Sequence, residues 1–253
     1  MIIDSPDHPL FSRTPAPPGR LISSLLNVFF KLLYSHLAWL YDLVAWIVSA
    51  GSWWEWQKSA LPEQVHGSIL DLGTGTGHLL RDLLLQDFNI TGMDKSRQMV
   101  SITRKKLLKN GLPSALVRAD VHRIPFPACS FDLLIATFPP RSLLQPKSAS
   151  EYFRLLKPGG QLRITLAVAA LLPDKHNVLL ITLHFFLKIL YGIIANKQQA
   201  SLTHSFFEEV FAGVGFTTKL CRIERNNAEL LVLCCSKPET EAARGINKYR
   251  MVE

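Results

Sequence analysis

From residue 66 onward, short apolar runs alternate with stretches of helical periodicity, and this alternation limits the folds open to the chain. The apolar runs predict strands at about 68–73, 90–94, 115–119, 131–137 and 161–168. Strands joined by helices build a doubly wound, mostly parallel sheet. Two further runs, "TTKLCRIER" and "ELLVLCC", flank the turn "NNA" and predict a hairpin. We therefore expect an α/β fold with a seven-stranded sheet whose last strand runs antiparallel to the rest.

The segments between the predicted strands have helical character. "GHLLRDLLLQD" and "SRQMVSITRKKLLKNG" follow the 3.6-residue period, and the second begins at Ser96, a plausible cap. "SLTHSFFEEVFAGVGF" predicts a helix that ends at a glycine. In "TRKKLLKNG", the basic side chains fall mostly on one outward stripe, which is typical of a solvated helix face.

The first strand leads into a glycine-rich turn in "ILDLGTGTGHLL", residues 69–80. Ligands of open α/β sheets lie beyond the carboxyl ends of the strands, and glycine there lets the backbone approach them closely. Gly73, Gly75 and Gly77 fit this role. Their spacing is G-x-G-x-G, whereas a dinucleotide fingerprint needs its third glycine at the position of His78. A turn that only lets a helix pack closely on a strand remains the alternative.

Acidic residues end the next two predicted strands. Asp94 in "NITGMDKS" is placed to accept hydrogen bonds from the ribose hydroxyls of an adenosine. Asp120 in "ALVRADVHRIPFP" is placed to accept one from an adenine amino group. Either acid alone could be a helix cap, but three such features at consecutive strand ends favour a nucleotide site.

With these features together, the chain resembles the class I S-adenosylmethionine-dependent methyltransferases of the small-molecule type, near the ubiquinone and menaquinone C-methyltransferases with a type 11 methyltransferase domain. The resemblance covers roughly residues 40–170 and rests on "YDLVAWIVSAG", "ILDLGTGTGHL", "GMDKSRQMV", "RADVHRIPFPACSFDLLIATF" and "EYFRLLKPGGQLRIT". It implies a Rossmann-like methyltransferase fold, S-adenosyl-L-methionine as the cofactor and an enzyme that transfers a methyl group.

The resemblance also implies roles for individual residues. The glycine loop would hold the methionine part, Asp94 the ribose, and Asp120 with Val121 the adenine. Thr137 and Phe138 would stand beside the methyl group, and Tyr41 in a segment that folds over the cofactor. The full set of cofactor residues is Asp71, Leu72, Gly73, Thr74, Gly75, Gly77, Asp94, Lys95, Met99, Asp120, Val121 and Thr137, and the acceptor set is Tyr41, Phe138 and Arg141.

The segment "TFPPRSL" departs from the family pattern. It differs from the usual sequence of quinone enzymes, and it lacks the polar and aromatic residues that flank the prolines in amino-group methyltransferases. Arg141 could bind an acidic group of the acceptor, with a solvated loop arginine as the alternative. No side chain is singled out as a catalytic base. His78 and His122 follow strands, and a histidine there is more often a surface or packing residue than a base.

Two apolar segments lie outside the common pattern. Residues 21–65 predict a helical cover with Trp53, Trp54 and Trp56 near its end, and residues 178–200 an apolar insert over the acceptor site. Lys31, Asp42 and Lys188 interrupt them, which argues against a membrane span. Cleft cover and contact with a membrane surface remain two open interpretations, and both predict an apolar acceptor. Residues 66–237 form the predicted methyltransferase domain, between a flexible lead (1–20) and a flexible tail (238–253).

The net charge, the aromatic residues and the cysteines limit the partners that we expect. The net charge of +8 permits attraction to nucleic acid, but the aromatic residues lie in apolar segments rather than in a basic groove, so we expect no nucleic-acid partner. The four cysteines have no metal-ligand spacing and are expected to be free thiols. We therefore expect no metal and a cytoplasmic protein, with membrane association left open. A regulatory protein that binds S-adenosylmethionine without turnover and a nicotinamide oxidoreductase are the alternatives.

Overall fold

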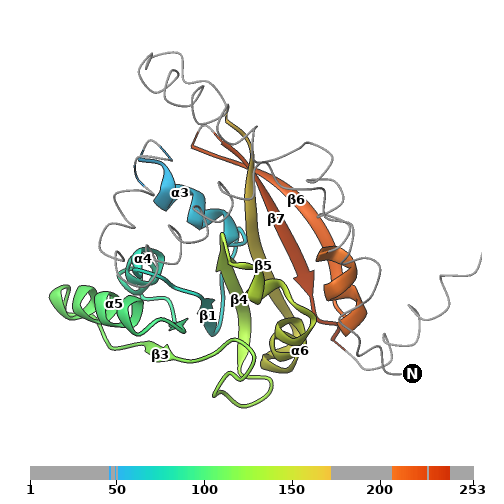
Figure 1. Cartoon of the computed structure of the whole chain (residues 1–253), viewed down its shortest axis with the longest axis horizontal. Helices are drawn as coiled ribbons and strands as arrows, with labels where there is room; N and C mark the ends of the chain where they lie inside the picture. Colours follow the sequence, from blue (N-terminus) through green and yellow to red (C-terminus); the bar gives the residue numbers. More distant parts are fainter. Residues whose placement is uncertain (1–45, 47–48, 50, 172–206, 227, 240–253) are drawn as a thin grey trace, which may run out of the picture.

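The computed structural model describes residues 46, 49, 51–171, 207–226 and 228–239. Most of the predicted helical cover, the apolar insert at 178–200 and nearly all of the C-terminal tail lie outside these residues. Seven strands form one sheet in the order β3-β2-β1-β4-β5-β7-β6 (Figure 1). The strands are β1 (Ile69–Leu72), β2 (Ile90–Asp94), β3 (Leu116–Arg118), β4 (Phe131–Thr137), β5 (Leu156–Leu171), β6 (Thr217–Arg225) and β7 (Ala228–Ser236).

The strand directions are those predicted from the sequence. β1 runs parallel to β2 and β4, β2 to β3, and β4 to β5. β7 is antiparallel to both β5 and β6. The predicted fold, a mostly parallel sheet with an antiparallel last strand, is therefore confirmed.

The start of β5 was predicted wrongly, because the strand begins at Leu156 and not near residue 161. Two consecutive glycines, Gly159 and Gly160, are typical of a turn, but here they form backbone hydrogen bonds with the chain after β7. Gly159 N–H donates to Lys237 O, and Lys237 N–H donates to Gly160 O. A partner remote in sequence thus extends the strand beyond its apolar run.

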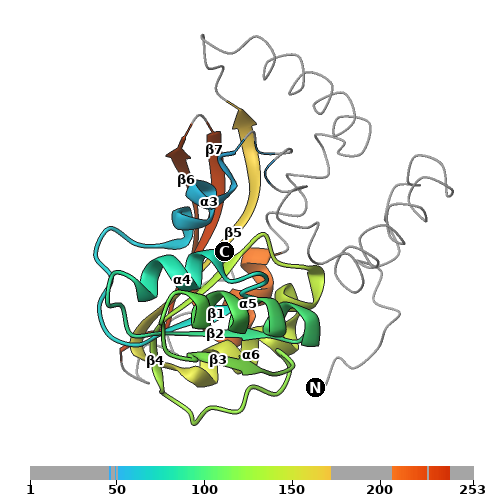
Figure 2. The same ribbon diagram turned by 90° about the vertical axis from the view of Figure 1, so that its left-hand side faces the viewer.

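Helices cover both faces of the sheet (Figure 2). One face carries α4 (His78–Leu84) and α5 (Arg97–Lys109), and the other carries α6 (Pro146–Leu155) and a helix described over 207–214. Each face has its own buried cluster, with Leu80, Leu83, Val100 and Leu107 against Ile69 and Ile135 on the first, and Tyr152, Phe211 and Phe216 against Leu162 and Leu233 on the second. At about 25 cal/mol per Å² of buried apolar surface, these clusters are the main force that holds the helices to the sheet.

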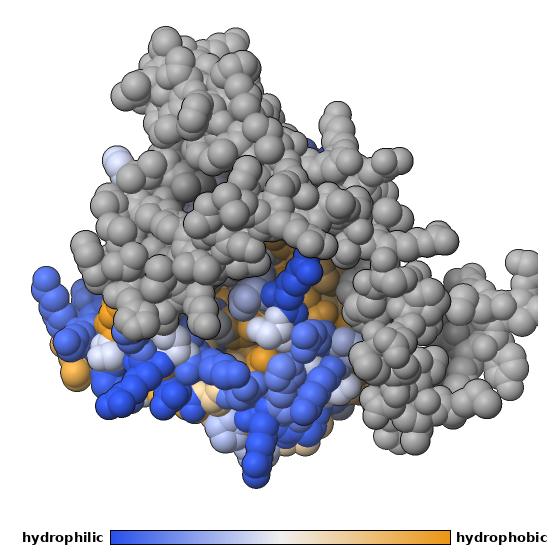
Figure 3. All heavy atoms as spheres, viewed as in Figure 1, coloured by the Kyte–Doolittle hydropathy of each residue, from blue (hydrophilic) through white to orange (hydrophobic). Residues whose placement is uncertain are grey.

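Charged side chains gather away from these clusters. Arg104, Lys105 and Lys109 on α5 are exposed, as predicted for a solvated helix face. Figure 3 shows hydrophilic side chains along the side of the molecule where α5 and β3 lie. Among the helices that the structure describes, none combines the length and apolarity needed to cross a bilayer.

A short tryptophan-rich helix, α3 (Trp53–Gln57), continues into the 3-10 turn η1 (Lys58–Ala60) and lies on the α4 side of the sheet. The hairpin turn between β6 and β7 holds it in place. Trp56 Nε1–H donates to Asn226 O at 3.5 Å, and Asn226 Nδ2–H donates to Ser52 Oγ at 3.2 Å. Ser59 and Thr165 share a buried hydroxyl hydrogen bond of 3.0 Å. The hairpin and β5 therefore fix α3 above the carboxyl end of β4.

Candidate functional site

The glycine-rich turn connects β1 to α4 at the carboxyl edge of the sheet. Gly73, Gly75 and Gly77 have φ angles of 73°, 57° and 73°, which L side chains rarely adopt. A Cβ on Gly77 would overlap the side chain of Thr103, whereas one on Gly75 would meet no non-neighbouring atom of the described residues closer than 4.0 Å. Gly77 thus serves helix packing, and Gly75 lies beside space that the described residues leave open.

Hydrogen bonds tie the glycine loop to its neighbours. The N–H groups of Gly73 and Thr74 both donate to Met93 O, at 2.8 and 2.9 Å. Thr103 Oγ1 on α5 donates to Gly75 O at 2.7 Å. The loop is therefore held rigidly before any ligand arrives, which lowers the entropy cost of binding.

Asp94 ends β2 directly beside this loop. Its Oδ2 accepts Gly75 N–H at 3.0 Å, and its Oδ1 accepts Ser96 N–H at 2.8 Å. Burial raises the pKa of Asp94, and the N–H groups of Ser96, Gly75 and Lys95 oppose that rise. Because a carboxylate has about four acceptor positions, capacity remains for further donors such as ribose hydroxyls.

Asp120 follows β3 and lies next to Lys95, which follows β2. Lys95 Nζ is 2.7 Å from Asp120 Oδ2, and His122 Nδ1 is 3.1 Å from Oδ1. Hydrogen bonds from Lys95 and from His122 N–H lower the pKa of Asp120 to about 2. His122 Nε2 also lies 3.1 Å from Gln145 Oε1. Two residues predicted to touch the cofactor separately, Lys95 and Asp120, are thus an ion pair at the strand edge.

Asp71 is the buried acid of the first motif, with 2% of its surface exposed. Burial raises its pKa from 3.8 to about 7, and the Thr74 hydroxyl nearby opposes part of the rise. Thr74 Oγ1 is itself buried without a well-formed hydrogen bond to any described residue. The end of β1 therefore holds a carboxyl group that is neutral at slightly acid pH, next to the Thr74 hydroxyl of the loop.

The raised pKa of Asp71 predicts a pH-dependent stability. The folded state binds a proton that the unfolded state releases near pH 3.8, so the free energy of unfolding should fall as pH rises from about 4 to 7. The amide of Asp71→Asn does not titrate, so this pH dependence is absent from the variant. Its free energy of unfolding should therefore rise relative to that of the wild type over the same pH interval, by up to about 4 kcal/mol at 1.36 kcal/mol per pKa unit. Urea unfolding at pH 4.5 and 7.5 measures the difference, and an unchanged difference between the two proteins would contradict a titrating Asp71.

The carboxyl end of β4 is lined by aromatic side chains. Phe138 follows Thr137 with a φ of 48°, an unusual conformation for a non-glycine residue, and its N–H donates to Thr165 O at 2.8 Å. Trp53 stacks on Phe138 with ring centroids 4.6 Å apart. Trp56, Val168 and Leu230 belong to the same apolar cluster. The predicted acceptor side is thus walled by α3.

A second stacked pair connects α3 to the glycine loop. Trp54 and His78, the first residue of α4, have ring centroids 3.7 Å apart at an angle of 24°. The sequence drew attention to the tryptophans of "GSWWEWQ" but did not pair them with these partners, because nothing in the local pattern fixes where α3 docks.

The remaining predicted residues are placed variously. Leu72, Met99 and Val121 are buried, with at most 5% of their surface exposed, and Arg141 is exposed in the 3-10 turn η2 (Arg141–Leu144). Tyr41 lies outside the described residues. No group of three or more histidines, cysteines or acids in the described ranges is placed to hold a metal ion.

The loop fits an adenosine-type cofactor on its own geometry. Among the described residues, Gly75 leaves room for close backbone approach, and Asp94 keeps acceptor capacity for a pair of hydroxyls. A loop needed only for helix packing would require Gly77 but not this arrangement at Gly75. The residues present therefore suit a nucleoside whose ribose lies against β2.

Comparisons with known proteins point the same way. Residues 69–160 match a family model described as a methyltransferase domain. A demethylmenaquinone methyltransferase of Thermus thermophilus is 33% identical over 138 residues, which are 51% of this chain and 62% of that protein. The ubiquinone/menaquinone biosynthesis C-methyltransferase of Wigglesworthia glossinidia brevipalpis is 31% identical over 54% of this chain and 59% of its own. The chain thus spans less than two thirds of the length of these relatives.

Solved structures share the fold. A protein of Methanococcus maripaludis assigned to the S-adenosyl-L-methionine-dependent methyltransferases matches with a TM-score of 0.61 and 20% identity, over 82% of this chain and 95% of its own. At that identity the likeness concerns the fold alone, so the chemistry has to be argued from the site.

Proposed function

We propose that this chain, which carries a class I methyltransferase domain of the S-adenosylmethionine-dependent kind, transfers a methyl group from S-adenosyl-L-methionine to a small apolar acceptor. The observation that carries the proposal is the rigid glycine loop, with open space beside Gly75 and the Asp94 carboxylate at its edge. Packing of α4 against Thr103 accounts for Gly77 but not for the space beside Gly75.

The residues divide the work by position. Gly73, Thr74 and Gly75 would hold the methionine part, Asp94 the ribose, and Asp120 the adenine. The bound cofactor supplies a methyl group on a positively charged sulfur, a good leaving arrangement. The protein's own task is to align the acceptor with that methyl group and to exclude water, and alignment of this kind can supply about 7–11 kcal/mol.

Lys95 is paired with the carboxylate that would bind the adenine, Asp120. Its ammonium group already occupies Asp120 Oδ2, while Oδ1 accepts His122 N–H. A carboxylate keeps further lone pairs, so an adenine amino group would join this network rather than replace it. We expect the ion pair to orient Asp120 for the adenine.

The aromatic wall supports an apolar acceptor. Trp53, Phe138, Trp56 and Val168 surround the end of β4, where an acceptor would face the methyl group. Pockets for small molecules are mostly apolar and aromatic, with few polar groups. The relatives are named for the methylation of demethylmenaquinone and for ubiquinone/menaquinone biosynthesis, and we propose a quinone-like, apolar acceptor for the present chain.

Trp53→Ala should weaken acceptor binding. Loss of an aromatic stack and its buried area is expected to raise the KM for an apolar acceptor about tenfold, while the Kd for S-adenosylmethionine changes less than about twofold. Methyl transfer from labelled cofactor to a demethylated naphthoquinol, followed as a function of acceptor concentration, measures this change.

The adjacent Trp54→Ala is the matched control. Its partner is His78 beside the glycine loop, so it should affect cofactor binding more than acceptor binding. The proposed acceptor wall would be wrong if the two variants had the same KM for the acceptor. No methyl transfer to any apolar acceptor, by a protein that binds the cofactor tightly, would favour a regulatory role instead.

A further inference from the structure

Two cysteines meet on the C-terminal hairpin. Cys234 on β7 donates to Cys221 on β6 with the sulfur atoms 3.2 Å apart. In the strand register Cys221 is opposite Val232 and Cys234 is opposite Lys219, so the two cysteines are diagonal neighbours on one face. Cys235, the next residue, is buried on the opposite face in the cluster with Phe211.

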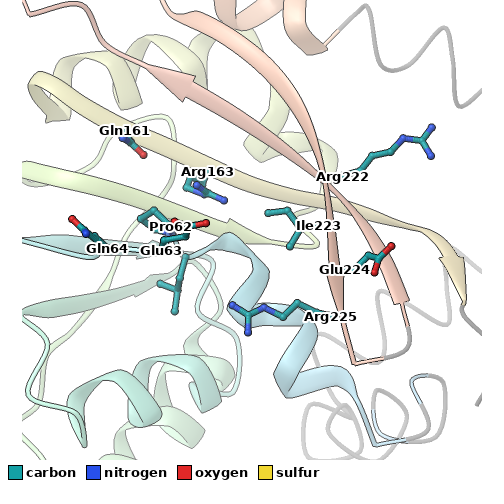
Figure 4. A pocket seen from close by; sticks show the side chains of 10 residues that line it. Pro62, Glu63, Gln64, Gln161, Arg163, Arg222, Ile223, Glu224 and Arg225 are labelled. Carbon is teal, nitrogen blue, oxygen red and sulfur yellow. The ribbon is translucent and has the colours of Figure 1, made fainter.

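The pair is not part of the proposed cofactor site. Cys221 and Cys234 are half-buried, and Cys234 is paired across strands with Arg163 on β5. Arg163 lines an open groove of about 790 Å³, with the chain before β1 at one wall and β6 at the other (Figure 4). The thiols therefore lie on the floor of the sheet beside a groove that solvent can enter.

We infer that Cys221 and Cys234 form an oxidisable dithiol that reacts with a small anionic disulfide and closes to a disulfide bond across β6 and β7. The reaction has two exchange steps. One cysteine thiolate attacks the small disulfide, which forms a mixed disulfide and releases one thiolate. The second cysteine thiolate then attacks the protein sulfur of the mixed disulfide, which forms the S–S bond and releases the other thiolate. The two protons lost by the cysteines are taken up by the two released thiolates, which become thiols, so the protein is oxidised and the small disulfide is reduced.

The charges next to Cys234 favour an anionic reactant. Arg163 and Lys219 flank Cys234 from the two neighbouring strands. The groove wall carries Arg222 and Arg225 as well as the acids Glu63 and Glu224, so the preference rests on the two cations beside the sulfur. Burial, and contact with the Cys221 thiol, raise the pKa of Cys234 to about 11, and the Arg163 and Lys219 charges oppose the rise. The Cys234 thiol is therefore protonated at neutral pH. Cations that attract an anionic disulfide would raise its concentration near the pair.

The position of β6 lets the strands adjust. Diagonal pairs of an antiparallel sheet are farther apart than directly opposite ones, so closure requires a small backbone movement. Among the described strands, β6 lies at the edge of the sheet with β7 as its one neighbour, and a shift of β6 breaks no second ladder of these strands. We expect the resulting bond to be easily reduced.

The test uses the full chain with Cys129→Ser, which removes the exposed thiol. Incubation with glutathione disulfide should convert the protein to a form lighter by two hydrogens, with the peptides of Cys221 and Cys234 joined and Cys235 still free. Cys234→Ser in the same background should instead retain a stable glutathione adduct at Cys221. Retention of all thiols, or adducts on both cysteines without a bond between them, would overturn the inference.

A second comparison separates proximity from charge. Phenylarsine oxide bridges two adjacent thiols without joining the sulfurs, and it should bind the parent protein but neither Cys221→Ser nor Cys234→Ser. Arg163→Gln should slow oxidation by glutathione disulfide about threefold to tenfold, and oxidation by neutral 2-hydroxyethyl disulfide much less. Arsenical capture with no disulfide formed by either oxidant would refute the dithiol chemistry, and equal slowing with both oxidants would refute the anion preference.

Discussion

Asp94→Asn should weaken S-adenosylmethionine binding on the order of 100-fold. Hydrogen bonds to a charged group contribute about 1.5–3 kcal/mol each, and the substitution removes the charge that two ribose hydroxyls would meet. The amide also places a donor against one of the two N–H groups that Asp94 now accepts, from Gly75 and Ser96. Titration calorimetry of both proteins with the cofactor gives the ratio of Kd values.

Asp132→Asn is the matched control for Asp94→Asn. Asp132 lies near the start of β4, at the end of the sheet away from the glycine loop. Its Oδ2 accepts Ser68 N–H and lies 2.7 Å from Lys157 Nζ. This variant should lose some stability, about 1 kcal/mol, with its Kd for the cofactor within twofold of wild type. A folded Asp94→Asn protein with wild-type affinity would remove Asp94 from the cofactor site.

Gly77→Ala should destabilise the fold by about 2–4 kcal/mol. A left-handed φ costs a non-glycine residue about 1–2 kcal/mol, and the new Cβ would overlap the buried Thr103. Adding Thr103→Ser removes the methyl group that the Cβ would meet and should restore part of the loss. Urea unfolding of the single and double variants measures both effects.

Gly75→Ala should affect cofactor binding more than stability. Its Cβ would enter open space, so the stability loss should stay near the about 1–2 kcal/mol of the left-handed φ alone, while the cofactor Kd rises at least about tenfold. If Gly75→Ala bound the cofactor normally and both glycine variants were equally destabilised, the loop would be a packing turn only.

The sequence predicted the fold well where the signal was local. β2 and β4 have the predicted bounds, and Ser96 caps α5 by accepting Met99 N–H, because strand alternation and capping depend on near neighbours. Asp94 and the glycines were located correctly at the strand ends, since parallel strands bring their carboxyl ends to one edge. Residues 69–160 match a methyltransferase domain, in agreement with the family that these motifs resemble.

Contacts between remote segments were not predictable from such patterns. The extension of β5 depends on Lys237, and the stack of Trp54 on His78 depends on how the β6–β7 turn holds α3. The Lys95–Asp120 ion pair requires two side chains from neighbouring strands to turn toward each other. The contact of Cys221 with Cys234 follows from the hairpin register, which sequence spacing alone does not fix.

Calorimetric titration of the purified protein with S-adenosyl-L-methionine and then with S-adenosylhomocysteine tests the central claim most directly. The glycine loop and Asp94 predict one site per chain with micromolar affinity for both ligands, and no comparable binding of NADH. A protein shown to be folded by its circular dichroism that binds neither ligand would contradict the account and reduce the loop to its packing role.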